Sequence, residues 1–71
     1  MGKSEIDVRP MGDGRWEVVA PDAVATFDEK ADAVIQAREW AIRLARAVVM
    51  IRDEAGSIEA EHDYERDRPE G

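Results

Sequence analysis

The residue types best suited to chemistry gather in the closing stretch of the chain, SIEAEHDYERDRPEG. It holds the one histidine and the one tyrosine of the 71 residues, His62 and Tyr64, among several carboxylates. Imidazole and carboxylate groups bind metals and transfer protons, so a metal site or an acid–base pair is the first hypothesis. In an extended strand, however, the nearest acids, Glu59, Glu61 and Asp63, point away from His62. We therefore expect no metal ligands here and expect His62 to pack beside Tyr64.

The remaining candidates for chemistry also have simpler structural explanations. The GDG of MGDGRW resembles a phosphate-binding loop, but such a loop precedes a helix, and this one joins two predicted strands. The chain has no cysteine, and Ser4 and Ser57 lie near a terminus and in a predicted turn. We therefore predict a protein that is not an enzyme and that needs no cofactor.

The net charge of −7 is concentrated at the C-terminus, where residues 53–71 hold eight acids and two bases. An acidic surface repels phosphate backbones and anionic lipids, so general affinity for nucleic acid or membranes is disfavoured unless Arg38, Arg43 and Arg46 form a local patch. The longest apolar run, Ala47–Ile51, is far too short to span a membrane, and the N-terminal residues lack the apolar stretch of a signal peptide. Without cysteines, the expected compartment is the cytoplasm.

Hydrophobic periodicity predicts strands on both sides of one helix. The alternating segments EIDVRP and RWEVVA flank the glycine-rich turn and predict a hairpin, and AVATF predicts a third, short strand. The helix is expected to begin after Asp28 as N-cap, with Thr26 and Glu29 as a rival capping box. After the helix, AVVMIR predicts an interior strand, DEAG a turn, and SIEAEHDY a last alternating strand.

The predicted helix has one apolar stripe and two isoleucines that lie outside it. The stripe consists of Ala33, Val34, Ala37, Trp40, Ala41, Leu44 and Ala45. Ile35 and Ile42 stack on each other away from the centre of this stripe, with Arg38 nearby. One sheet cannot cover both faces of the helix. Either a loop or the third strand covers the isoleucines, or they form a self-association face.

The order of these landmarks resembles that of a bacterial family, domain of unknown function 2188. The family pattern is a proline, a glycine-rich turn and a tryptophan, then a helix of the type EAixxAre, then VvxxxxGxI and a closing SYGxDPxP. The corresponding segments here are Pro10 to Trp16, DAVIQARE at 32–39, VVMIRDEAGSI at 48–58 and DYERDRP at 63–69. The chain departs from the pattern at Glu29, Asp63, Glu65 and Arg68. The resemblance implies one helix on an antiparallel sheet and supplies no catalytic residues.

Together these features predict a two-layer α+β domain over residues 1–64. One helix packs on a small antiparallel sheet in the element order ββ(β)αββ, and a short polar tail covers residues 65–71. The sheet face away from the helix is expected to be open and acidic. Its predicted acidic residues are Glu17, Glu59, Glu61 and Asp63.

Two functional hypotheses follow from this architecture. The leading one is a non-enzymatic interaction module that forms a homodimer through Ile35, Ile42 and Arg38 and presents its acidic surface to a protein partner. The alternative is a nucleic-acid accessory or regulatory protein. Its contacts to nucleic acid would come from Arg38, Arg43 and Arg46.

Overall fold

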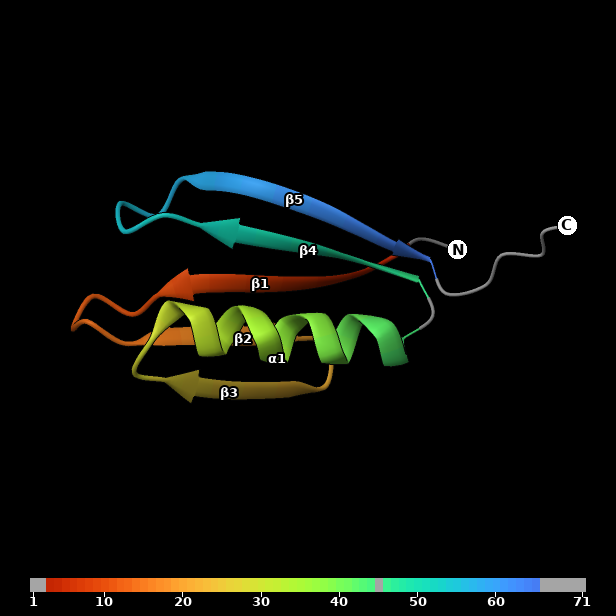
Figure 1. Ribbon diagram of the computed structural model, residues 1–71, viewed down its shortest axis with the longest axis horizontal. Coiled ribbons are helices and arrows are strands. Elements are labelled where there is room, and N and C mark those ends of the chain that lie inside the picture. The colour runs from red at the N-terminus through yellow and green to blue at the C-terminus, as the bar shows by residue number, and fades with distance from the viewer. Residues whose placement is uncertain (1–2, 45, 66–71) are drawn as a thin grey trace, which may run out of the picture.

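Five strands and one helix make up the part of the chain that the computed structural model describes, residues 3–44 and 46–65 (Figure 1). The elements are β1 (Ser4–Pro10), β2 (Trp16–Ala20), β3 (Ala23–Phe27), α1 (Lys30–Arg43), β4 (Arg46–Arg52) and β5 (Ile58–Glu65). The predicted α+β class and element order are therefore confirmed. β5 includes Glu65, the first residue of the predicted tail, and residues 66–71 lie outside the described residues.

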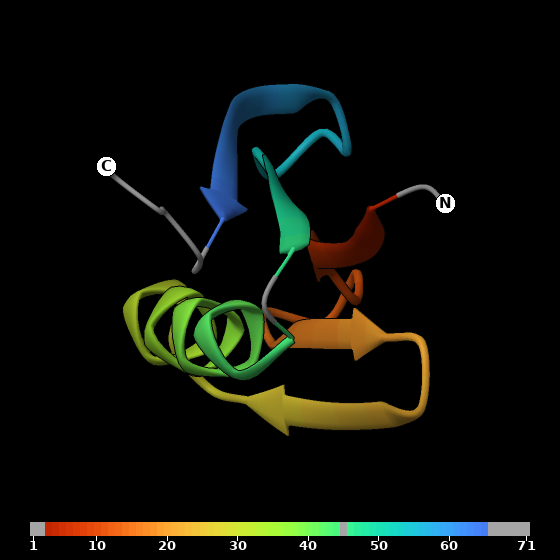
Figure 2. The same ribbon diagram turned by 90° about the vertical axis from the view of Figure 1, so that its right-hand side faces the viewer.

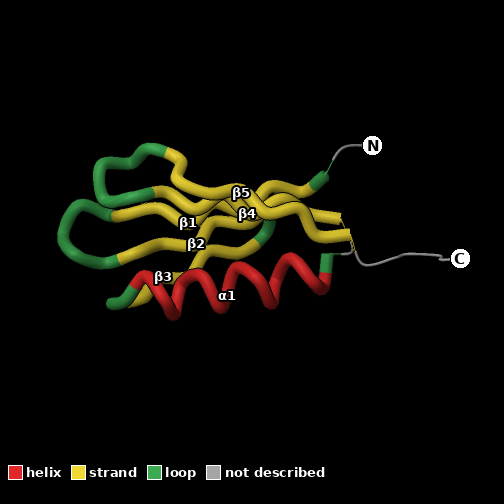
Figure 3. Tube along the Cα trace, turned by 45° about the horizontal axis from the view of Figure 1, so that its top comes forward, coloured by secondary structure: helices red, strands yellow, loops and turns green. Residues whose placement is uncertain are grey.

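The five strands form one mixed sheet in the order β3-β2-β1-β4-β5. Three neighbouring pairs are antiparallel, whereas β1 and β4 run parallel, with Ile6 opposite Val49 and Val8 opposite Ile51. The prediction of an antiparallel sheet is therefore wrong at this central pair. The cause is the crossover: β3 runs in the direction of β1, α1 returns along the sheet, and β4 begins at the same end as β1 (Figure 1). As a result, the β1–β2 and β4–β5 connections lie at the same end of the sheet (Figure 3).

The core lies between α1 and one face of the sheet, which curves around the helix (Figure 2). The helix buries Ala33, Ala37 and Ala41 completely. The buried sheet residues are Ile6, Val8, Trp16, Val18, Ala20, Ala47, Val49 and Ile51. Because alanine lets the helix approach the sheet closely, most of the core volume comes from the strands. The predicted alanine-rich stripe is thus confirmed for its described members.

α1 begins one residue later than the sequence predicts. The N-cap is Glu29, whose backbone is extended and whose carbonyl accepts a hydrogen bond from the Ala33 amide at 3.3 Å. Its side chain makes no capping hydrogen bond, so neither Asp28 nor a Thr26 capping box starts the helix. No helix in the described part of the chain is long and apolar enough to span a lipid bilayer.

The turn between β1 and β2 is held by Asp13. Its carboxylate accepts hydrogen bonds from the Arg15 amide at 3.1 Å and from the Arg15 guanidinium at 3.3 Å. Gly12 and Gly14 adopt positive φ angles of 92° and 93°, which other residues adopt only with strain. The hydrogen bond from the Arg15 amide is the main reason that the pKa of Asp13 falls below its usual value of 3.8.

The ionised Asp13 carboxylate should therefore stabilise the folded state. Because its pKa is lower in the folded chain, this contribution is complete above the unfolded pKa and is lost as the pH falls through the folded pKa. A carboxyl NMR titration should give Asp13 a midpoint below 3.8. Asp13→Asn should lower stability at neutral pH but not below that midpoint. A midpoint at or above 3.8 would contradict the hydrogen bonding of this turn.

The turn between β4 and β5 is held in the same way by Asp53. One oxygen of its carboxylate accepts hydrogen bonds from the amides of Ala55 at 2.9 Å and Ser57 at 3.0 Å. Gly56 adopts a φ angle of 92° and donates its amide to the Asp53 carbonyl at 2.9 Å. The turn predicted from DEAG is confirmed.

Candidate functional site

The large apolar side chains that α1 leaves exposed lie on its side away from the sheet. Ile35 is 53% exposed and Ile42 is 54% exposed, opposite the buried alanines. β3 pairs with β2 at the sheet edge and does not cover them. With Arg38 and Glu39 they line a hollow of about 220 Å³. We call these four residues the outer face of α1.

The outer face carries one charge of each sign at its centre. Neither Arg38 nor Glu39 makes a hydrogen bond or an ion pair with any described residue. A guanidinium offers five N–H donors and a carboxylate offers several acceptor positions. Both side chains are therefore available to a second molecule.

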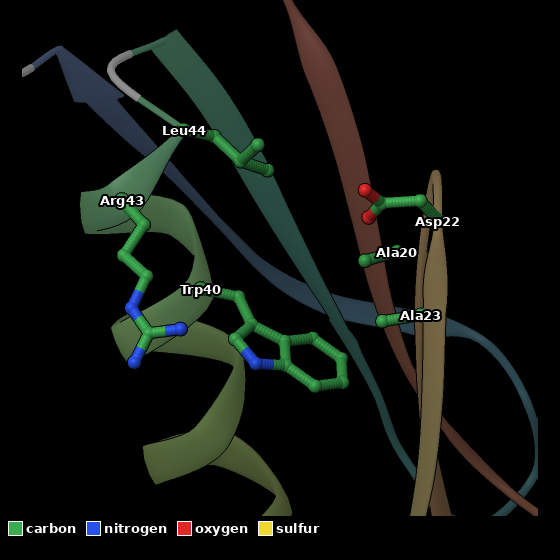
Figure 4. A pocket seen from close by; sticks show the side chains of 6 residues that line it. All are labelled: Ala20, Asp22, Ala23, Trp40, Arg43 and Leu44. Atoms are coloured by element: carbon green, nitrogen blue, oxygen red, sulfur yellow. The ribbon is translucent and has the colours of Figure 1, made fainter.

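The three arginines of the nucleic-acid hypothesis do not share a surface. Arg38 lies on the β5 flank of α1, where it lines a groove with His62. Arg43 lies on the opposite flank, across a hollow from the turn between β2 and β3 (Figure 4). Arg46 precedes the buried Ala47 in β4, so it faces the side of the sheet away from the helix. Binding along a phosphate backbone needs basic groups on one surface, and these three point in different directions.

The acids of the sheet face away from α1 are mostly paired with bases. Glu17 accepts a hydrogen bond from Arg9 at 3.3 Å, and Asp63 lies 3.1 Å from the Lys3 ammonium. Glu61 is exposed and has no ion pair with a described residue. This face therefore mixes both charges, and such exposed pairs contribute little to stability.

The best-formed ion pair of this face joins β1 to β4. The Arg52 guanidinium donates to both oxygens of Asp7, at 2.9 and 3.1 Å, and to the Gly56 carbonyl at 2.9 Å. The hydrogen bonds to Asp7 raise the pKa of Arg52 above its usual value. This bidentate contact fixes the parallel strand pair and the neighbouring hairpin.

Glu59 does not lie on that face, contrary to the prediction. The β4–β5 ladder has a bulge between Ile51 and Arg52, which leaves Glu59 without a paired residue. Its carboxylate instead lies 2.6 Å from the Lys30 ammonium at the start of α1. That ammonium lies 5.0 Å from the centroid of the Trp16 ring. The bulge therefore turns Glu59 towards the helix, where it ties β5 to α1.

His62 and Tyr64 lie on the helix side of β5, as their alternation with the acids predicts. They are opposite Val49 and Ala47 of β4, both of which are buried. With Arg38 they line a groove of about 290 Å³ between α1 and β5. Within residues 3–44 and 46–65, no three histidine, aspartate or glutamate side chains form a group that could hold a metal ion.

Another hollow, of about 280 Å³, lies between the last turns of α1 and the turn that joins β2 to β3 (Figure 4). The indole of Trp40 projects into it from the helix, and Asp22 and Arg43 stand on opposite sides. The sequence did not predict this hollow, because helical spacing assigned Trp40 to the apolar stripe that packs on the sheet. The space forms only when the helix lies against the small Ala20 and Ala23.

The outer face, the groove and this hollow each combine apolar side chains with an arginine. The arginine is Arg38 on the outer face and in the groove, and Arg43 beside Trp40. Such surfaces bind by burying apolar groups and by donating charge-assisted hydrogen bonds to anionic groups. Each of the three surfaces therefore offers an apolar contact area beside a donor for an anionic group.

Comparison with known proteins agrees with the arrangement of landmarks in the sequence. No curated protein and no solved structure matches the chain significantly. The family described as "Uncharacterized protein conserved in bacteria (DUF2188)" matches residues 6–64, from β1 to β5. The resemblance seen in the sequence is thus confirmed, and the chain belongs to the domain of unknown function 2188 family.

Proposed function

We propose that this protein is a non-enzymatic cytoplasmic interaction module that forms a homodimer through the outer face of α1. The observation that carries the proposal is the self-complementarity of this face. Ile35 and Ile42 lie on one line along the helix, and Arg38 and Glu39 lie between them on its two flanks. Two copies of the helix can therefore meet around a two-fold axis with complementary groups opposite one another.

The two-fold axis specifies which residues meet. In a parallel pair of helices in register, Ile35 of each copy meets Ile35 of the other, and the two Ile42 side chains meet in the same way. Arg38 of each copy then lies opposite Glu39 of the other, which adds two ion pairs beside the apolar contact. An antiparallel pair would bring equal charges together on each flank, so the charges favour the parallel arrangement in register.

The proposed contact is small, which sets its expected strength. Two half-exposed isoleucines per copy bury much less surface than the roughly 1,600 Å² of a standard protein interface. We therefore expect a weak dimer, with a Kd on the order of 100 µM. Association still benefits the domain, because a core of this size rarely supplies more than about 3–5 kcal/mol.

Sedimentation analysis of the full chain tests the dimer. The weight-average mass should rise towards that of a dimer between roughly 10 µM and 1 mM, around the expected Kd. Ile35→Asp combined with Ile42→Asp should remain monomeric, because burial of the new carboxylates is costly. Val24→Asp is the matched control, since Val24 is 59% exposed on β3 and lies outside the outer face. A monomer at all concentrations, or a dimer that survives the double substitution, would contradict the proposal.

A dimer of this kind leaves the sheet face away from α1 accessible to a protein partner. The net charge of −7 and the exposed Glu61 favour a partner with basic residues. The nucleic-acid hypothesis has no comparable support, because Arg38, Arg43 and Arg46 point in different directions.

A further inference from the structure

We propose that the groove between α1 and β5 binds a small organic anion, a carboxylate on a flat apolar body. The lining residues are Val34, Arg38, Val49, Ile51, His62 and Tyr64. The volume of about 290 Å³ is at the lower end for small-molecule sites. It therefore suits a ligand of about one ring rather than a nucleotide or a protein segment.

The floor of the groove is apolar and formed by the packed core. Val49 and Ile51 are buried in β4, the strand next to β5. Val34 is half-buried on α1 and packs against the same core. Packed interiors keep such side chains in fixed positions, so a flat ring would meet a preformed surface.

The rim carries three polar groups from two elements. Arg38 comes from α1, whereas His62 and Tyr64 come from one face of β5. None of the three makes a hydrogen bond or an ion pair with a described residue. A guanidinium, an imidazole N–H and a phenol hydroxyl can each donate a hydrogen bond to a carboxylate. Polar donors that converge over an apolar floor are typical of small-molecule sites.

Three acids of β5, Glu59, Glu61 and Asp63, do not oppose an anion at this rim. Glu61 and Asp63 alternate with His62 and so face the other side of the sheet, and Glu59 is paired with Lys30. The net charge of −7 nevertheless repels anions at long range. Binding should therefore depend on the carboxylate and the ring together, because the ring supplies the apolar contact and the donors at the rim offset the repulsion of the carboxylate.

Binding to the full chain can be tested by amide NMR titration with benzoate, benzamide and acetate. Benzoate should shift the amides of Val34, Arg38, His62 and Tyr64 saturably, with a Kd on the order of millimolar for a ligand this small. Benzamide lacks the charge and acetate lacks the ring, so each should bind at least about fivefold more weakly. Equal shifts with benzoate and benzamide, or no saturable shift with benzoate, would overturn the proposal.

Two arginines on opposite flanks of α1 provide a matched pair of variants. Arg38→Gln should weaken benzoate binding at least about fivefold, whereas Arg43→Gln should leave it unchanged. Both residues are exposed, so the amide spectra should show an intact fold. His62→Ala provides a second variant of the rim and should also weaken binding. Unchanged binding in Arg38→Gln, or loss of binding in Arg43→Gln, would overturn the assignment to this groove.

The groove and the proposed dimer can be tested separately, although Arg38 lines both surfaces. Ile35 and Ile42 do not line the groove. Benzoate binding should therefore persist in the variant that carries Ile35→Asp and Ile42→Asp. If binding disappears in this variant while its fold is intact, the ligand site depends on the dimer, and the proposed single-chain groove is wrong.

Discussion

Replacing Ile6 by alanine should lower the free energy of unfolding by about 2–5 kcal/mol, which is enough to unfold most of the protein. Ile6 lies in the central strand β1, is completely buried and pairs with Val49 of β4. Removing its side chain leaves a cavity at the interface between sheet and helix, and a core this small has little stability to lose. Urea unfolding followed by tryptophan fluorescence measures the effect. If Ile6→Ala does not fold, Ile6→Val should fold and lose about 0.5–1.5 kcal/mol.

The matched control for this prediction is the same substitution on the outer face of α1. Ile42 is 54% exposed, so Ile42→Ala should change the stability of the monomer by less than about 1 kcal/mol. The comparison should be made well below the expected dimer Kd, where association does not contribute. Similar losses for Ile6→Ala and Ile42→Ala would contradict the assignment of one isoleucine to the core and the other to the surface.

Reversing one charge of the outer face should strongly weaken the dimer. Arg38→Glu would place two glutamates opposite each other on both sides of the two-fold axis, and Glu39→Arg would place two arginines there. Each substitution should weaken the dimer at least about tenfold, as measured by sedimentation. Arg43→Glu, on a flank of the same helix, should have a much smaller effect. A variant with both Arg38→Glu and Glu39→Arg should regain the dimer, because opposite charges again face each other.

Local patterns in the sequence were sufficient to predict the elements and most of their exposed sides. Alternation in EIDVRP, RWEVVA and SIEAEHDY correctly indicated strands and the side on which His62 and Tyr64 lie. The helical spacing of Ile35 and Ile42 correctly placed them away from the alanine-rich stripe. These predictions succeeded because each depends on a period of two or 3.6 residues within one element.

The features that the sequence did not predict depend on contacts between distant segments. The parallel pairing of β1 with β4 follows from the crossover through α1. Hydrophobic periodicity within one segment does not show how distant strands are connected. The position of Glu59 follows from a bulge in β5 that interrupts the alternation, so the contact with Lys30 could not be predicted by counting residues. The hollow beside Trp40 likewise requires the helix to lie on the sheet.

Mixing the two single charge variants tests the proposed parallel homodimer most directly. In a mixed dimer, the two adjacent glutamates of the Arg38→Glu variant would face the two adjacent arginines of the Glu39→Arg variant, so both contacts across the axis would be attractive. Sedimentation should therefore show monomers for each variant alone and a one-to-one heterodimer for the mixture. A mixture that remains monomeric, while the unsubstituted protein dimerises, would contradict the pairing of Arg38 with Glu39.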